Sequence, residues 1–475
     1  MMQILSKESA LTAGVQPLLL QEADIKAGIL HIGIGAFHRA HQAVYTEEAI
    51  ASAGGDWGII GVSLRSREIV DDLKSQDMLY SVTTRSAEGD DIRVVGSIVD
   101  AVAASVEPGV VMHHLADPAI RIVSLTVTEK AYGLDPTTGG LDRNHPAVAH
   151  DLEHPQNPIG AVGYLVEGLA LRRAAGEKAY TVLCCDNLPS NGDVVKRLVL
   201  EMARERDAAL ADWIDSQATF PNTMVDRIVP AATQDTRDRA AKLLGVDDRL
   251  ALETESFIQW VIEDHFVSGR PAWEKAGALF VEDVAPYEKM KLRLLNGAHS
   301  LIAYLGQLHG LDYVRDVMGV AEYRDRVRGH MQTAAKTLDP VPGMEIAAYI
   351  DDLLARFANP TIAHRTAQIA MDGTQKLPQR IFAPAIDALA AGDDAEGFAY
   401  VTALWLTFVL RRDSIDDPRA AELLQAARLS QSENDAAARL QPFLEIPGLF
   451  PAALADDPRW QQALARQMTT IEATL

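Results

Sequence analysis

Residues 27–35 read AGILHIGIG, an apolar run that ends in two glycines, Gly33 and Gly35. The next segment, 40–54 (AHQAVYTEEAIASAG), spaces its apolar residues as a helix does. Glycines between a strand and a helix permit a tight turn and bring backbone N–H groups close to a pyrophosphate at the helix N-terminus. The stretch therefore predicts a dinucleotide-binding strand, turn and helix.

The turn itself is the expected contact with the cofactor. We predict that Gly33, Gly35, Ala36 and Phe37 bind the dinucleotide. The usual fingerprint has a third glycine, and His38 stands in its position. Taken alone, the glycine pair is equally compatible with a purely structural turn.

Other apolar runs continue this pattern through the first half of the chain. They are residues 57–64 (WGIIGVSL), 91–99 (DIRVVGSIV), 120–128 (IRIVSLTVT) and 180–187 (YTVLCCDN), with a helical segment at 161–176. Apolar runs without strict alternation are typical of parallel strands buried on both faces. We predict that residues 1–285 form a Rossmann-like α/β domain with a mostly parallel sheet.

The second part of the chain has a different texture. Helical periodicity dominates residues 287–310, 345–358, 398–412 and 418–429, which are separated by Gly, Pro and Asp. A chain of 475 residues also exceeds what one hydrophobic core usually serves. We therefore predict a second, mainly α-helical domain over residues 286–475, which carries the substrate site and the catalytic residues.

The charge balance limits the class of partner. The formal net charge is −22, and such a surface repels nucleic acids and anionic lipids. A small-molecule substrate is expected, and a substrate carboxylate would need a local cationic pocket. The N-terminus lacks the features of a signal peptide and no apolar run has membrane length. We expect a cytoplasmic protein that is a monomer or a small homo-oligomer.

No metal site is expected. The two cysteines, Cys184 and Cys185, are adjacent in an apolar run, so we expect them to pack within a strand. His38 and His41 could share one helical face, but no third ligand is evident and a helix N-terminus disfavours a dication. Helix capping and packing are the expected roles of these two histidines.

The second predicted strand bears on the choice of cofactor. Its end carries Ser63, Arg65 and Arg67 in place of the acidic residue that usually binds the ribose of NAD. Arg65 could pair with the 2′-phosphate of NADP, or both arginines could be solvated. We predict NAD and leave NADP open.

Residues 287–306 (YEKMKLRLLNGAHSLIAYLG) suggest catalysis. At about 100° per residue, Lys291, Asn296 and His299 fall within one broad side of a helix. Such polar groups are costly to bury on an apolar helix unless they serve each other or a ligand. Periodicity alone also allows a solvated lysine, a helix-interior amide and a core histidine.

The chemistry of ketone reduction gives these residues roles. Hydride transfer to a ketone leaves an alkoxide, which a lysine with a lowered pKa could protonate. Amide groups aimed at the developing oxyanion would stabilise it, and Asn296 and Asn187 are the candidates. Asp226, in an apolar and loop-like run, could bind substrate hydroxyls or influence the lysine, or could be an ordinary turn residue.

Six stretches resemble one family, the polyol-specific long-chain dehydrogenases, which includes mannitol 2-dehydrogenase and fructuronate reductase (D-mannonate oxidoreductase). The stretches are HIGIGAFHRAHQAVY, IVSLTVTEKAYG, CDNLPSNG, FPNTMVDRIVPA, WVIEDHFVSGRPAWEKAG and PYEKMKLRLLNGAHS. The likeness runs in order from about residue 29 to at least residue 383. It implies a metal-independent enzyme that usually uses NAD.

The resemblance also implies residue roles. Lys291 would be the general acid–base, and Asn296 would form the oxyanion hole with Asn187. His299 would contact the substrate, and Asp226 would lie in the same pocket.

The segment 364–380, HRTAQIAMDGTQKLPQR, is similar to the fructuronate reductase branch, whereas mannitol dehydrogenases tend to carry arginine where Gln368 stands. CDNLPSNG, in contrast, resembles mannitol dehydrogenase. A sugar acid carries a carboxylate that needs a buried partner. Arg365, Lys376 and Arg380 are candidates, with surface charge as the alternative for each, and Lys376 is favoured.

The function predicted from the sequence is reversible, NAD(H)-dependent reduction of the C5 ketone of D-fructuronate to D-mannonate, with Lys291 as the proton donor. The alternative is a mannitol 2-dehydrogenase or another polyol dehydrogenase, acting on mannitol and fructose, arabinitol or tagaturonate. A dinucleotide sensor without turnover is a third reading, but it would not need an acid–base lysine.

Overall fold

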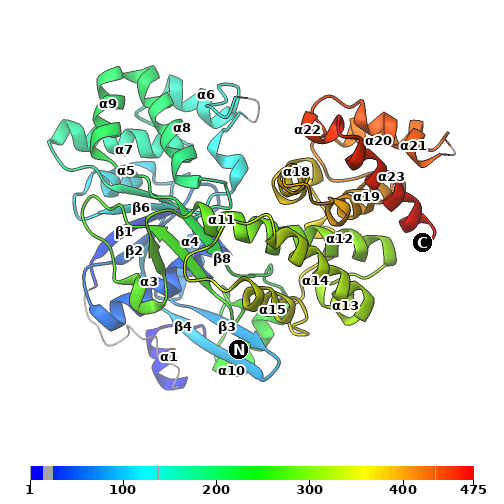
Figure 1. The fold of residues 1–475 in the computed structure, drawn as a ribbon. Helices are drawn as coiled ribbons and strands as arrows, with labels where there is room; N and C mark the ends of the chain where they lie inside the picture. The colour runs from blue at the N-terminus through cyan, green and yellow to red at the C-terminus, as the bar shows by residue number, and fades with distance from the viewer. Residues whose placement is uncertain (1, 14–24, 136–137, 434) are drawn as a thin grey trace. The chain divides into compact units, whose positions relative to one another are not determined.

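The computed structural model describes residues 2–13, 25–135, 138–433 and 435–475. The chain divides into two compact units, Met1–Ala285 and Pro286–Leu475 (Figure 1). The first unit mixes helices and strands, and the second is helical. The predicted fold class is confirmed.

A five-stranded, all-parallel sheet forms the centre of the first unit. Its order in space is β5 (Ile98–Ala103), β2 (Gly58–Ser63), β1 (Ala27–Ile32), β6 (Ile122–Leu125) and β7 (Thr181–Cys184). The chain builds outward from β1 through β2 and β5, and then places β6 and β7 on the other side. Ligands of such sheets bind beyond the carboxyl ends of the strands at this reversal, which lies between β1 and β6.

Both faces of the sheet are buried, which explains why its strands read as continuous apolar runs. Leu30 belongs to the core shared with α5 (Pro108–Ala116), α7 (Ala161–Ala175) and α8 (Asn191–Arg206). Its neighbour Ile29 belongs to the core on the opposite face, with α3 (Gln42–Ala53). The remaining helices of this unit are α1 (Lys7–Ala13), α2 (Ala36–Ala40), α4 (Glu68–Ser75), η1 (Glu129–Tyr132), α6 (Pro146–Glu153), α9 (Ala208–Gln217), α10 (Gln234–Leu244) and η2 (Trp273–Ala276).

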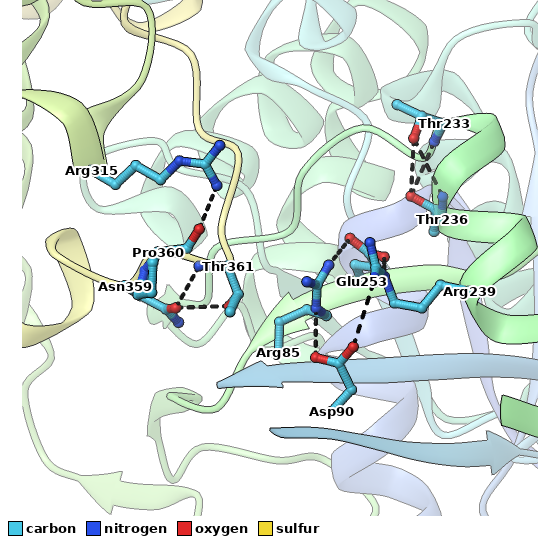
Figure 2. A network of polar contacts seen from close by, with 10 residues as sticks. All are labelled: Arg85, Asp90, Thr233, Thr236, Arg239, Glu253, Arg315, Asn359, Pro360 and Thr361. Atoms are coloured by element: carbon cyan, nitrogen blue, oxygen red, sulfur yellow. Dashed lines mark hydrogen bonds and ion pairs between the residues drawn. The ribbon is translucent and has the colours of Figure 1, made fainter. Parts of the chain in front are cut away.

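Two small sheets complete the first unit. One contains β4 (Gly89–Val95), β3 (Tyr80–Ser86) and β9 (Leu252–Glu255), and the other contains β11 (Leu279–Val281), β10 (Gln259–Glu263) and β8 (Thr223–Asp226). A charge network joins the first of these to α10 (Figure 2). In it, Arg85 contacts Asp90 at 2.7 Å and Glu253 at 3.0 Å, and Arg239 contacts Glu253 at 2.8 Å.

The segment 91–99 differs from the single predicted strand. It is divided between β4 and β5, which lie in different sheets. The chain turns at Gly96 and Ser97, where the Gly96 N–H donates to Glu47 Oε1 at 2.9 Å and the Ser97 hydroxyl donates to the Ala43 carbonyl at 2.7 Å. These bonds to α3 redirect the backbone between two apolar runs.

The second unit packs its helices around α19 (Glu396–Leu410), which is buried on most of its surface. Two segments, η3 (Leu292–Asn296) and η4 (Pro378–Phe382), are π-helical turns within longer helical stretches. The other elements are α11 (Ala285–Lys291), α12 (Gly297–His309), α13 (Val314–Gly319), α14 (Ala321–Ala335), α15 (Ile346–Phe357), α16 (Thr366–Ile369), α17 (Gly373–Leu377), α18 (Ala383–Ala390), α20 (Ala420–Ser430), α21 (Ala436–Leu444), α22 (Ala452–Ala455) and α23 (Pro458–Glu472).

The two cysteines behave as predicted. Cys184 and Cys185 are buried free thiols at the end of β7, and they belong to the cores on opposite faces of the sheet. Over the described ranges, every helix is too short or too polar to span a membrane.

Replacement of Arg172 by Met should destabilise the first unit strongly. Arg172 is 2% exposed, and its guanidinium donates to the carbonyls of Leu115, Asp117, Ile120 and Lys178 at 2.5–3.2 Å. Without these donors the buried carbonyls are unsatisfied, at a cost of about 3 kcal/mol or more in the free energy of unfolding.

The neighbouring Arg173 provides the control for this urea-unfolding experiment. Its guanidinium makes a partly exposed ion pair with Asp207 at 2.8 Å. Arg173→Met should cost less than about 1 kcal/mol. Equal losses for the two variants would contradict the structural role of Arg172.

Candidate active site

The turn after β1 has a backbone conformation that requires glycine. Gly33 has a φ of +104°, and a Cβ built there would lie 2.1 Å from the carbonyl oxygen of Thr126. Its N–H donates to the Val62 carbonyl at 2.8 Å, which ties the turn to the end of β2. Gly35 has a φ of −67°, is exposed, and its built Cβ would meet nothing closer than 4.0 Å. The turn thus leaves open backbone at the start of α2, which fits a dinucleotide.

His31 fixes this turn from within β1. It is fully buried, with Nδ1 2.8 Å from Ser124 Oγ and Nε2 2.9 Å from Thr126 Oγ1 and 3.2 Å from the Gly33 carbonyl. Burial lowers the pKa of His31 to about 3, so the ring is neutral at physiological pH. The ring of His38 stacks on it, with centroids 3.4 Å apart.

The packing predicted for His38 and His41 is confirmed. His41 stacks on Phe37 at 4.9 Å and meets the edge of Trp260 at 5.8 Å. The predicted capping role is wrong for His41, because its side chain makes no capping bond and Nε2 bonds the Gln259 carbonyl at 2.9 Å instead.

The end of β2 presents basic side chains to solvent. Ser63 is buried, whereas Arg65 and Arg67 are exposed. Arg67 pairs with Asp71 of α4 at 3.0 Å. The guanidinium of Arg65 is exposed, and its predicted role in cofactor binding stays a hypothesis.

Asp186 joins the loop after β6 to the end of β7. Its carboxylate accepts hydrogen bonds from the Val127 N–H at 2.9 Å, the Thr128 N–H at 3.1 Å and the Tyr132 hydroxyl at 2.7 Å. Burial raises the pKa of Asp186. Thr128 has the unusual backbone angles φ 75° and ψ 150°, and the three bonds hold this strained conformation in place.

Asn187 and Asp226 belong to segments that Asn191 ties together. Asn187 follows β7 and is exposed, whereas Asp226 ends β8 and is 5% exposed. The side chain of Asn191 donates to the carbonyls of Asp186 at 3.0 Å and Thr223 at 2.9 Å and accepts from the Thr223 N–H at 2.9 Å. Asp226 lies in a strand that pairs with β10, so the prediction of a loop at this residue is wrong.

In the second unit, a π-helical turn separates Lys291 from His299. In a regular α-helix, Lys291 and Asn296 would point about 140° apart at 100° per residue. The π-turn η3 bonds residues five apart, as the Gly297 N–H does with the Leu292 carbonyl. Because such a turn closes over one residue more than an α-turn, it rotates Asn296 toward the side of the helix that carries Lys291.

Lys291 and His299 are both buried, at 8% and 6% exposure. The ring of His299 packs against Phe357 at 4.6 Å and meets His364 edge-on at 5.1 Å. Nowhere in the described ranges does a group form a hydrogen bond with His299 Nε2. A buried ring nitrogen in this state is suited to bonding a ligand.

Several basic side chains act electrostatically on His299. Burial, and then the charges of His364, Arg380, Arg356 and Lys291, lower the pKa of His299 well below its usual value. The imidazole is therefore neutral at physiological pH. It can donate or accept one hydrogen bond without adding charge to the pocket.

The three candidates for a substrate carboxylate have different surroundings. The Lys376 ammonium donates to the carbonyls of Met371 at 2.7 Å and Ile369 at 3.2 Å, at the end of α16. Arg365 is exposed, with its guanidinium 5.2 Å from the centre of the Tyr313 ring. Arg380 is half-buried on η4.

Sequence reasoning missed Asp186, Asn191, Arg356 and His364. Asp186 follows a buried strand and Asn191 begins the next helix, and both stand in the quoted motif CDNLPSNG, so a signal was available. The position of Arg356 on α15 offered no comparable signal. Within the described residues, no group of three His, Cys, Asp or Glu side chains could hold a metal ion.

Comparisons with known proteins agree with this arrangement. Residues 27–275 match the mannitol dehydrogenase Rossmann domain, and residues 283–472 match the mannitol dehydrogenase C-terminal domain. The chain belongs to the mannitol dehydrogenase family. It is thus an NAD-dependent oxidoreductase that acts on secondary alcohols.

Similar members of the mannitol dehydrogenase family differ in substrate. The chain is 45% identical to D-mannonate oxidoreductase of Escherichia coli (strain K12), with 91% of this chain and 90% of that one covered. It is 39% identical to mannitol 2-dehydrogenase of Pyrenophora tritici-repentis (strain Pt-1C-BFP), with 94% of this chain and 80% of that one covered. A solved structure of Pseudomonas fluorescens mannitol 2-dehydrogenase with NAD and D-mannitol matches with a TM-score of 0.87 and 37% identity. The match covers 99% of this chain and 97% of that one.

Gly33→Ala should lower the free energy of unfolding by about 2 kcal/mol or more, because its Cβ would clash with backbone at a positive φ. Gly35→Ala is the matched control and should change stability by less than about 0.5 kcal/mol, since its Cβ is unobstructed. Urea unfolding without cofactor measures both. Comparable stability of the two variants would rule out the steric requirement at Gly33.

Buried His31 should make stability fall on acidification. The unfolded chain binds a proton at His31 below about pH 6.5, whereas the folded chain, with a pKa of about 3, does not. The contribution of His31 to the free energy of unfolding is therefore fully present above pH ~6.5 and is lost as the pH falls. At pH ~5 the loss from this residue is about 2 kcal/mol. His31→Phe should reduce the difference in unfolding free energy between pH ~7.5 and ~5 by that amount, and an unchanged difference would refute the assignment.

Proposed function

We propose that the chain catalyses the reversible, NAD(H)-dependent reduction of D-fructuronate to D-mannonate. The observation that carries the proposal is the buried Lys291, which lies on the same helical stretch as the buried His299. Within the described residues, His299 Nε2 has no hydrogen-bond partner and can bond a substrate. The 45% identity to D-mannonate oxidoreductase supports the same substrate class. The proposal includes a metal-independent enzyme in the cytoplasm, a monomer or small homo-oligomer.

Lys291 is the proposed acid–base group. In the reductive direction it donates a proton to the oxygen of the C5 carbonyl as that carbon is reduced, and it takes the proton back in the oxidative direction. Bound NAD supplies the hydride chemistry. Lys291 is largely buried, so the proton transfer would take place away from bulk water.

Asn296 and Asn187 are the proposed oxyanion donors. Their amide N–H groups would stabilise the negative charge that develops on the carbonyl oxygen before it is protonated. The π-turn η3, which turns Asn296 toward the side of Lys291, supports the proposed part of Asn296. His299 would bond a substrate hydroxyl through its Nε2, and Asp226 would bind another hydroxyl.

The charges around His299 favour a sugar acid. Arg380, Arg356 and Lys291 all act electrostatically on His299, and cationic side chains attract a carboxylate more strongly than a neutral hydroxyl. Lys376 contributes to the same electrostatic environment, because burial and the charge of Lys376 lower the pKa of His364 to about 4. We therefore retain Lys376 as a proposed contributor to substrate binding.

Polyol oxidation is the second candidate. The solved mannitol 2-dehydrogenase in complex with NAD and D-mannitol is similar over 99% of this chain. The proposed acid–base chemistry acts equally on a neutral secondary alcohol. The two candidates therefore differ in binding, and not in the proton transfer.

Substrate choice is tested with purified protein and D-fructuronate, D-tagaturonate or D-fructose, each with NADH or NADPH. The reaction is measured through the absorbance of the reduced cofactor. The expected result is that kcat/KM is highest for D-fructuronate with NADH. Efficient fructose reduction without turnover of either uronate would establish the second candidate instead.

Lys291→Ala should reduce kcat by about 10²–10⁴-fold, while the Kd for NADH stays within about 2-fold, because acid–base catalysis contributes that much to the chemical step. Lys289→Ala is the matched control, since Lys289 is a half-exposed lysine on the same helix that pairs with Asp339 at 3.0 Å. It should retain activity. Wild-type turnover by Lys291→Ala would remove the proposed acid–base role.

A further inference from the structure

Thr128, three residues after the end of β6, has a backbone conformation that is almost exclusive to glycine. Its φ of 75° and ψ of 150° fall in a region that residues with a Cβ rarely enter. Ser190 and Asp372 also have positive φ, but their ψ angles of 52° and 38° place them in the left-handed helical region, which other residues visit more readily. Thr128 is therefore strained in a way that these two residues are not.

Asp186 holds the loop in this conformation. Its carboxylate accepts from the N–H groups of Val127 at 2.9 Å and Thr128 at 3.1 Å. It also accepts from the Tyr132 hydroxyl at 2.7 Å, and the Ala131 N–H donates to the Thr128 carbonyl at 3.0 Å. These hydrogen bonds offset the strain at a single residue.

The fold alone does not explain why residue 128 is a threonine. A glycine would adopt the same angles without strain, and most of the described residues with positive φ, including Gly33 and Gly133, are glycines. The side chain of Thr128 is exposed, so it adds little to the core. Strained residues that their surroundings hold in place cluster at ligand sites. We therefore expect the Thr128 side chain to contact a ligand.

The loop that carries Thr128 lies against the glycine turn after β1. Thr126 Oγ1 donates to the Gly33 carbonyl at 2.8 Å, and the Thr126 N–H donates to the Ile32 carbonyl at 3.0 Å. The Cα atom of Thr128 lies within about 7 Å of that of Thr126, because two residues span no more than this. The order of the sheet reverses between β1 and β6, and ligands of such sheets bind at this reversal.

We propose that the Thr128 hydroxyl binds the ribose in the nicotinamide half of the dinucleotide, and that Asp186 is the positioning residue that holds Thr128 for this contact. The Gly33 turn is the proposed pyrophosphate site, and this ribose is bonded directly to the pyrophosphate. A threonine hydroxyl both donates and accepts, which matches the hydroxyls of a ribose. The proposal concerns the NAD cofactor and is independent of which sugar the enzyme reduces.

The test measures the Kd for NADH by fluorescence titration of the full-length enzyme without a sugar substrate. Thr128→Val keeps the branched shape but loses the hydroxyl, and it should raise the Kd about 5- to 10-fold, as expected for one hydrogen bond. Thr128→Ser keeps the hydroxyl and should stay within about 3-fold of the wild type. Asp77→Gly is the control, because Asp77 is an exposed residue with a φ of 50° in the turn between α4 and β3. It should bind NADH as the wild type does.

Thr128→Gly separates cofactor binding from stability. Its urea-unfolding midpoint without cofactor should equal or exceed that of the wild type, because glycine removes the strain. Its Kd for NADH should nevertheless rise at least as much as in Thr128→Val. A lower midpoint would show that the fold itself needs the threonine and would overturn the proposal. A wild-type Kd in Thr128→Val, or a rise confined to the KM of the sugar, would overturn the assignment to the cofactor.

Asp186→Asn tests the positioning role. It replaces one acceptor oxygen with an NH₂ group that faces donors, so the loop loses part of its support. The substitution should raise the Kd for NADH about 5-fold or more in the wild-type background and less than about 2-fold in the Thr128→Gly background, where the contact is already absent. Equal increases in the two backgrounds would remove the positioning role of Asp186.

Discussion

The candidate site of the second unit depends on the burial of one lysine. Lys291 lies at a helix end with 8% exposure, although a buried charge is among the most costly groups in a protein interior. Burial of such a group requires partners within the fold, and Lys291 has interactions with its surroundings.

The first unit achieves precision by a different physical means. Its strand ends are held by hydrogen bonds from side chains to backbone, with Asp186 accepting three and Asn191 making bonds on two segments. Such bonds fix loops that have little apolar surface of their own. Asn187 projects from this framework as an exposed residue on a positioned loop.

Local patterns revealed much of this fold and part of the site. The apolar runs located the parallel strands, and the glycines located the turn that Gly33 makes at positive φ. The division of residues 91–99 between two sheets was missed, because it depends on bonds from Gly96 and Ser97 to a helix distant in sequence. The directions of the Lys291 and Asn296 side chains were predicted from regular α-helical spacing. The structure has the π-turn η3 between them, and no argument from periodicity could reveal its extra residue. The neighbours of His299 come from three other segments, and only the folded chain brings them together.

The two π-turns, η3 and η4, also have a consequence for how the protein evolves. Each π-turn holds one residue more than a regular turn needs, so a single deletion would restore ordinary α-helical bonding and gain local regularity. Thermodynamic stability alone would favour that deletion, whereas it would rotate the polar side chains that follow it away from their present direction. The two segments therefore keep an irregular backbone that local stability alone does not favour, as expected where natural sequences are not optimised for stability.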